Sequence, residues 1–109
     1  MTELSLERAA RNEAVFRDAN ELLEERRAEL AALSGRTPFL CECSDPNCKG
    51  VISLTVEEYE HVREQPNRFV LEPGHPALEA TIVEEHEDYH VVEKHGVSRR
   101  VVEQADPRG

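Results

Sequence analysis

All three cysteines of this 109-residue chain lie within eight residues of one another, in the run Phe-Leu-Cys-Glu-Cys-Ser-Asp-Pro-Asn-Cys-Lys-Gly at positions 39–50. Cys41 and Cys43 share one face of a predicted strand, because side chains alternate along a strand with a period of two. The turn sequence Ser-Asp-Pro-Asn before Cys48 favours a reversal that returns the third thiol to the same point. Converging thiolates are typical of zinc sites, so this spacing predicts one here.

A tetrahedral zinc ion takes four ligands, and the chain offers five histidines for the fourth position. We favour His75, because it lies in the rigid turn Pro-Gly-His-Pro and follows directly on a predicted strand at 68–71. His86 is the second choice, and His61 would have to be presented by a short helix. A carboxylate or a water molecule in the fourth position would make the site open.

Two other interpretations of the cysteines compete with the zinc site. The thiols could be small buried hydrophobic side chains without a metal, or Cys41 and Cys43 could form a redox pair. The odd number of cysteines argues against a disulfide framework. Three thiolates make zinc a poor Lewis acid, and no glutamate is placed as a general base, so we expect a structural Cys3His site and no enzyme.

The composition is that of a small acidic protein. Hydrophobic residues make up 39% of the chain and the formal net charge is −10, so the core is modest and a metal would support it. The acidic excess argues against nucleic acid and anionic membranes as partners. The chain has no apolar run long enough to span a membrane and no secretory signal, so we expect a cytoplasmic location with reduced thiols.

Residues 2–33 predict one long amphipathic helix, since they contain no Pro or Gly and are rich in Ala, Leu, Glu and Arg. Gly35 would end it as the C-cap. The expected apolar stripe has three–four spacing and consists of Phe16, Ala19, Leu23, Leu30 and Leu33, with Val15 and Leu22 alongside. The helix is too long to bury this whole stripe on so small a core, so it could also bind a protein partner. A coiled coil is conceivable, but Arg26 at a seam position weakens it.

The remainder of the chain predicts short elements. Thr55 and Glu58 form a capping box that opens a short helix through about residue 64. Strands are expected at 39–43, 51–54, 68–71, 81–84, 89–93 and 97–103. The predicted fold class is therefore α+β. It comprises a long N-terminal helix (1–35), a zinc-stapled antiparallel β domain with one short helix (36–104) and a flexible tail (105–109).

Carboxylates and imidazoles crowd the segment 84–90, which contains His86 and His90. They could form a second metal site or the solvated tip of a hairpin. We favour the hairpin tip, because a turn at 86–88 would place the two histidines on different faces.

Several short segments resemble a group of small bacterial proteins to which no activity is assigned. They are Arg11-Asn-Glu, Phe39-Leu-Cys-Glu-Cys43 with Cys48, Leu54-Thr-Val-Glu-Glu-Tyr-Glu60, Pro73-Gly-His75 and Val91-Val-Glu-Lys94. The resemblance implies that Cys41, Cys43, Cys48 and His75 act as one unit, and it implies no particular function.

The function that the sequence favours is that of a non-enzymatic adaptor or regulator. It would bind zinc through Cys41, Cys43, Cys48 and His75 and would contact a protein partner through the helix at 2–33. A thiol redox sensor, in which oxidation ejects the metal, is the first alternative. A nucleic-acid-binding zinc module is the second, and it lacks the basic patch that such modules need.

Overall fold

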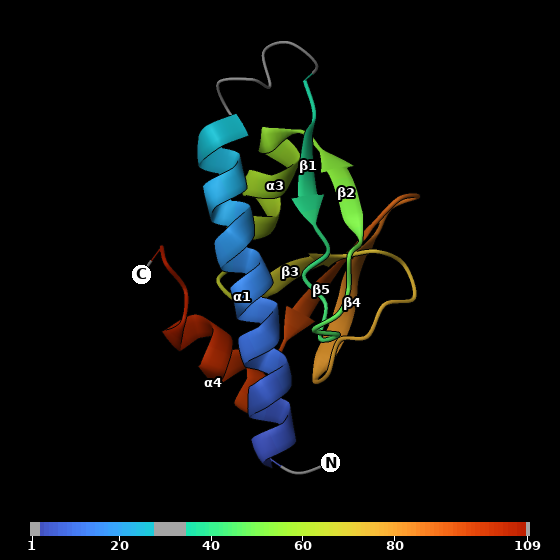
Figure 1. Ribbon diagram of the computed structural model, residues 1–109. Helices are drawn as coiled ribbons and strands as arrows, with labels where there is room; N and C mark the ends of the chain where they lie inside the picture. Colours follow the sequence, from blue (N-terminus) through green and yellow to red (C-terminus); the bar gives the residue numbers. More distant parts are fainter. Residues whose placement is uncertain (1–2, 28–34, 109) are drawn as a thin grey trace.

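The computed structural model describes residues 3–27 and 35–108. A long helix, α1 (Glu3–Arg27), extends along most of the molecule, with all strands on one side of it (Figure 1). The α+β class is confirmed. The rest of the expected helix, with Leu30 and Leu33, lies outside the described residues.

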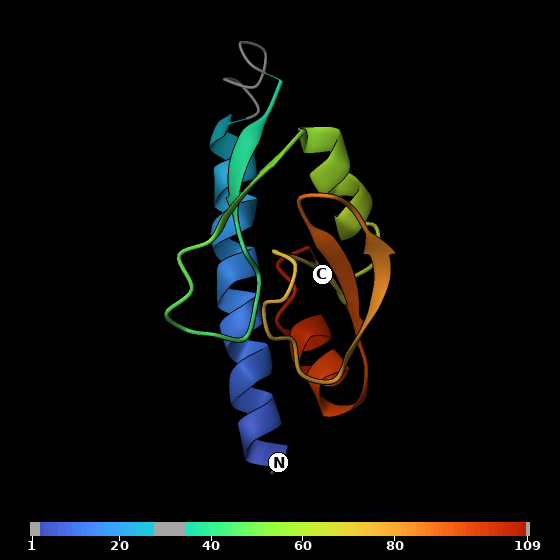
Figure 2. The same cartoon turned by 90° about the vertical axis from the view of Figure 1, so that its right-hand side faces the viewer.

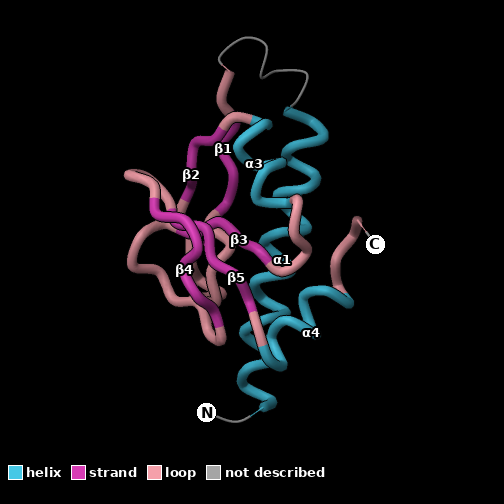
Figure 3. The backbone as a smooth tube through the Cα atoms, turned by 180° about the vertical axis from the view of Figure 1, so that it is seen from behind, coloured by secondary structure: helices cyan, strands magenta, loops and turns pink. Residues whose placement is uncertain are grey.

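The strands form two small antiparallel sheets that Figure 3 shows from behind. One sheet pairs β1 (Thr37–Leu40) with β2 (Val51–Leu54). The other has the order β3-β5-β4 and contains β3 (Arg68–Leu71), β4 (Ala80–Glu85) and β5 (His90–Lys94). The predicted strand at 68–71 and the predicted hairpin are therefore confirmed.

The strand predicted at 39–43 ends at Leu40 instead, because the chain changes sheets at this point. The amide of Cys41 still donates to the Gly50 carbonyl of the β2 side at 3.0 Å. The next amide, that of Glu42, donates to the Val70 carbonyl in β3 at 2.8 Å. The segment 41–43 therefore joins the two sheets.

The short helix α3 (Val56–Arg63) has the predicted capping box. The Glu58 amide donates to Thr55 Oγ1 at 3.0 Å, and the Thr55 amide donates to Glu58 Oε1 at 2.8 Å. Tyr59 of this helix is buried and stacks on Phe39 of β1 with 4.3 Å between ring centroids. This pair anchors α3 on the core.

The strand predicted at 97–103 is wrong: this segment is a helix, α4 (Gly96–Gln104). Its valines favour a strand locally. The helix is instead capped by a distant side chain, since Glu79 Oε1 accepts hydrogen bonds from the amide and the hydroxyl of Ser98, both at 2.8 Å. Val102 then lies fully buried against the core. Among residues 35–108, two short helices, not one, accompany the sheets.

The face that α1 turns toward the protein is mostly polar, which differs from the expected apolar stripe. Phe16, Ala19 and Leu23 are only partly buried, and Val15 and Leu22 are exposed. The buried residues of α1 follow one another at three–four spacing and are Ala10, Glu13, Ala14, Arg17 and Asn20. A buried polar group is costly unless it is paired, so the partners of these side chains decide how α1 is held.

Each buried polar side chain of α1 meets a different part of the fold. Glu13 forms an ion pair with Lys94 of β5 at 2.8 Å, and both side chains are fully buried. Arg17 donates to the carbonyls of Pro66 at 2.6 Å and Val102 at 2.7 Å. These contacts join α1 to β5, to the loop before β3 and to α4.

Asn20 and Glu42 form a buried contact between α1 and the segment that follows β1. The Asn20 amide group accepts a hydrogen bond from the Leu40 amide at 2.7 Å and donates to the Leu40 carbonyl at 2.8 Å. The Glu42 carboxylate accepts hydrogen bonds from Asn20 Nδ2, the Tyr59 hydroxyl and the Val70 amide, each at 2.9 Å. One buried carboxylate thus links α1, α3 and β3.

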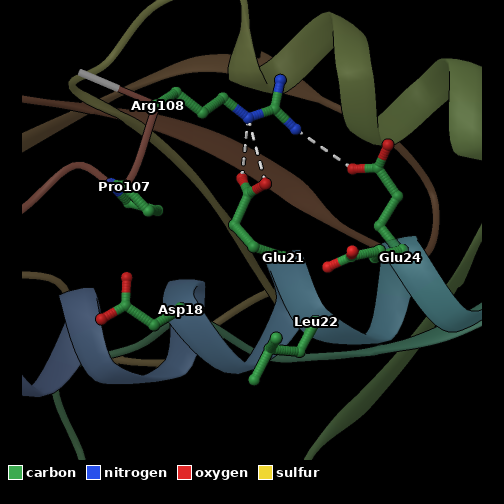
Figure 4. Close-up of a pocket in the computed structure, with 7 residues that line it drawn as sticks. Asp18, Glu21, Leu22, Glu24, Pro107 and Arg108 are labelled. Atoms are coloured by element: carbon green, nitrogen blue, oxygen red, sulfur yellow. Dashed lines mark hydrogen bonds and ion pairs between the residues drawn. The ribbon is translucent and has the colours of Figure 1, made fainter.

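The C-terminal residues 105–108, placed by the sequence in a flexible tail, are anchored on α1 and α3. Asp106 accepts a hydrogen bond from the buried Arg63 at 2.5 Å. Arg108 forms ion pairs with Glu21 at 3.0 Å, Glu24 at 3.1 Å and Glu60 at 2.7 Å. Figure 4 shows the first two of these pairs. Exposed ion pairs stabilise weakly one by one, but several around one guanidinium hold the turn in place.

We predict that Glu42→Ala lowers the free energy of unfolding by about 3 kcal/mol or more, because three buried donors lose their acceptor together. Glu57→Ala, at an exposed position of α3, is the control and should change stability by less than about 0.5 kcal/mol. Urea unfolding of metal-replete protein measures both variants. Equal stability of the two variants would contradict the role of Glu42.

Stability should also depend on the protonation of Glu13. Burial raises the pKa of this carboxyl from 4.5 to about 7, although Lys94 opposes the rise. The folded state therefore binds a proton more tightly than the unfolded state, and this contribution to stability is lost as the pH rises from 4.5 to 7.

Glu13→Gln should remove this pH dependence of the free energy of unfolding. The difference in stability between wild type and variant should therefore change by on the order of 2–3 kcal/mol between pH 4.5 and pH 7. Urea unfolding at several pH values with saturating zinc measures it, with Glu57→Gln as the control. If the difference in stability stays constant from pH 5 to pH 7, the pKa of Glu13 is not raised.

Candidate metal centre

The four side chains predicted from the sequence as one cluster do converge. One donor atom from each of Cys41, Cys43, Cys48 and His75 lies within 4.8 Å of the other three. Cys41 and Cys43 are buried, whereas Cys48 and His75 are partly exposed. The cluster could therefore hold a metal ion.

Two loops bring these residues together. Cys48 lies after a turn in which its amide donates to the Asp45 carbonyl at 3.1 Å, and Asp45 Oδ1 accepts from the Asn47 amide at 2.9 Å. His75 lies in a second turn, closed by a hydrogen bond from its amide to the Glu72 carbonyl at 3.1 Å. The Ser44 amide donates to the Pro76 carbonyl at 3.0 Å and joins the two loops.

Two distances within the cluster, both from His75 to a sulfur, suit a tetrahedral ion. His75 Nδ1 lies 3.5 Å from Cys41 Sγ and 3.4 Å from Cys48 Sγ. Around zinc, with Zn–S of about 2.3 Å and Zn–N of about 2.0–2.1 Å, tetrahedral angles place sulfur and nitrogen about 3.5 Å apart. The observed sulfur–nitrogen distances match this value, so Nδ1 is the atom of His75 that would bind the ion.

Backbone amides support two of the sulfurs. The Glu72 amide donates to Cys41 Sγ at 3.2 Å, and the Gly50 amide donates to Cys48 Sγ at 3.4 Å. Hydrogen bonds of this kind stabilise thiolates that ligate a metal. The two loops that supply the ligands thus also supply the backbone amides that donate hydrogen bonds to the sulfurs.

The two buried thiols, those of Cys41 and Cys43, do not ionise easily without a cation. Burial raises the pKa of the Cys41 thiol well above its usual range, although the Glu72 amide opposes the rise, and burial raises the pKa of Cys43 as well. Three thiolates would also repel one another at this separation. A divalent cation removes both penalties, because it binds the deprotonated sulfurs directly.

The other four histidines have different partners. His61 and His86 each place Nε2 at 2.8 Å from the Glu84 carboxylate, and His95 Nε2 lies 3.1 Å from Thr81 Oγ1. His90 lines a cavity of about 290 Å³ beside His75. Within residues 3–27 and 35–108, the Cys3His cluster is the one group of three or more Cys, His, Asp or Glu close enough to hold a metal.

Glu42 is the residue at this site that sequence reasoning missed. It lies between two cysteines, and its carboxylate points away from them into the contact with α1, α3 and β3. Burial raises its pKa, which its hydrogen-bond donors oppose. Its position between Cys41 and Cys43 was the available signal, since alternation places it on the face opposite the thiols.

No protein-family model, curated protein or solved structure shows a significant match to this chain. The resemblance to small bacterial proteins therefore stays a prediction. Among the described residues, no helix is both long enough and apolar enough to cross a membrane.

We predict that His75→Ala weakens metal binding by at least about 100-fold, since loss of even an outer-shell partner costs roughly 10–100-fold. His90→Ala is the matched control: it removes an imidazole from the same cavity without removing a ligand, and affinity should stay within a factor of about three. Competition with a chromophoric chelator measures both. If both variants lose the same affinity, His75 is not the fourth ligand.

Proposed function

We propose that the protein is a cytoplasmic, non-enzymatic adaptor or regulator whose fold is stabilised by a structural zinc ion and which acts through protein contacts. The convergence of Cys41, Cys43, Cys48 and His75 within 4.8 Å supports it. Zinc is the metal proposed, because three sulfurs and one imidazole nitrogen in a tetrahedral arrangement are the donor set of structural zinc sites.

The arrangement of the ligands favours a structural role over a catalytic one. A catalytic zinc has three protein ligands and keeps the fourth position for water or substrate. Here the protein supplies all four donors from two loops that are tied together, so the ion would fix the relative position of segments 41–50 and 72–76. When bound, it supplies folding free energy.

The non-enzymatic part of the proposal rests on the surroundings of the cluster. One carboxylate close to the cluster belongs to Glu72, whose Oε2 lies 4.0 Å from His75 Nε2. It faces the side of the imidazole away from the sulfurs, so it would orient this ligand. Metal-ligating histidines commonly have such a carboxylate partner.

Capture of partners from the native cell tests the adaptor role. We expect full-length, zinc-loaded protein to recover a defined protein partner, and we expect Cys43→Ser to lose it, because loss of one thiolate disrupts the fold. Arg99→Ala, at an exposed position of α4, should retain the partner. Recovery of no protein above background, or equal recovery with Cys43→Ser, would contradict an adaptor that depends on the metal.

A redox sensor is the second candidate, favoured by the partial exposure of Cys48 and His75. Oxidants react with accessible thiolates, and a zinc site that loses one sulfur releases its ion. Peroxide treatment of the zinc-loaded protein should then release zinc, which a colorimetric zinc indicator detects, and a thiol reductant with zinc should restore the site. Zinc that stays bound at full thiol modification of Cys48 would dismiss this candidate.

A further inference from the structure

In the part of the chain that the structure describes, the outer face of α1 carries two large apolar side chains that are mostly exposed. Val15 and Leu22 are each 62% exposed. They are seven residues apart, so at 3.6 residues per turn they point in nearly the same direction. In Figure 2 both short helices and the three-stranded sheet lie to one side of α1.

The charges along this exposed face are ordered by sign. Arg8 and Arg11 precede Val15, whereas Asp18 and Glu25 follow it, and all four are exposed. The N-terminal half of the face is therefore basic and the C-terminal half acidic. Such a face is complementary to itself when two copies run in opposite directions.

We propose that a second copy of this chain covers the face, through antiparallel pairing of the two α1 helices. The two-fold axis would pass near Asp18, so that Val15 of one copy packs on Leu22 of the other, and the reverse. In this register Arg11 of each copy lies opposite Glu25 of the other. The pair would thus gain two apolar contacts and two ion pairs.

A groove beside the face favours the same occupant. It has a volume of about 630 Å³ and runs between α1 and the C-terminal turn. It is lined by Asp18, Glu21, Leu22, Glu24, Glu25, Pro107 and Arg108 (Figure 4). Four carboxylates against one guanidinium leave the groove acidic, which suits the guanidinium of the second copy's Arg11.

The antiparallel register contains an unfavourable contact between the two copies, which provides a specific test of it. The two Asp18 carboxylates would face each other near the two-fold axis, where like charges weaken the pair. A contact between two helix faces is also smaller than the standard interface of roughly 1,600 Å². We therefore expect a monomer–dimer equilibrium with a Kd of about 10–100 µM, strengthened severalfold by Asp18→Asn.

Sedimentation equilibrium of full-length, zinc-loaded protein tests the pairing. Leu22→Asp should raise the Kd by at least about tenfold, because a buried leucine contributes more than 1.4 kcal/mol. Val51→Asp is the matched control, since Val51 is 56% exposed on β2, away from α1. It should leave the Kd unchanged.

Charge reversal tests the antiparallel register itself. Arg11→Glu and Glu25→Arg should each weaken the dimer, and the double variant R11E/E25R should restore it, because both ion pairs are then rebuilt with the signs exchanged. Failure of the double variant to restore the dimer would overturn the register. A wild-type protein that stays monomeric at 1 mM would overturn the proposal.

The inference rests on the part of the proposed function in which the protein acts through protein contacts, and it does not involve the metal. A folded, zinc-loaded monomer would therefore refute the pairing alone. If the purified protein contained no zinc, the proposed metal centre would be refuted. The pairing of the α1 helices would still be tested by sedimentation equilibrium.

Discussion

The alternation of three side chains at Cys41, Glu42 and Cys43 is the constraint on which the rest of the structure depends. The two thiols point to the metal cluster, and the carboxylate between them points to the other side, where Asn20, Tyr59 and the Val70 amide donate to it. The tripeptide also carries the chain from one sheet to the other. A shift of one residue would send the carboxylate into the thiols and a thiol into the α1 contact. The candidate metal centre and one of the buried contacts that hold α1 therefore depend on the same three residues.

The contact with α1 explains how so small a core holds so long a helix. Its inward face buries Glu13, Arg17 and Asn20, and each forms hydrogen bonds or an ion pair with a different element. Buried polar contacts of this kind contribute modest net stability, because desolvation offsets much of the attraction. They do specify position, since a helix rotated or shifted along its axis would leave several buried groups unpaired. The apolar residues left on the outside are then available for contacts beyond the protomer.

Local signals were sufficient to predict much of the fold and the candidate site. Thr55 and Glu58 predicted α3, the turn sequences predicted both loops of the cluster, and the Pro-Gly-His-Pro turn selected His75 among five histidines. The errors have a common physical cause: distant side chains decide the outcome. α4 forms where valines favour a strand, because Glu79 caps it. The buried face of α1 was missed because a polar stripe at helical spacing is normally exposed, and its partners, such as Lys94 and Glu42, are far away in the sequence.

Native mass spectrometry of the protein purified without added metal or chelator tests the central claim most directly, combined with thermal unfolding before and after zinc removal. The account predicts one zinc ion per chain and a melting temperature that falls by at least about 15 °C on removal of the ion, since structural zinc contributes folding free energy directly. A metal-free protein whose melting temperature does not change when zinc is added would contradict it.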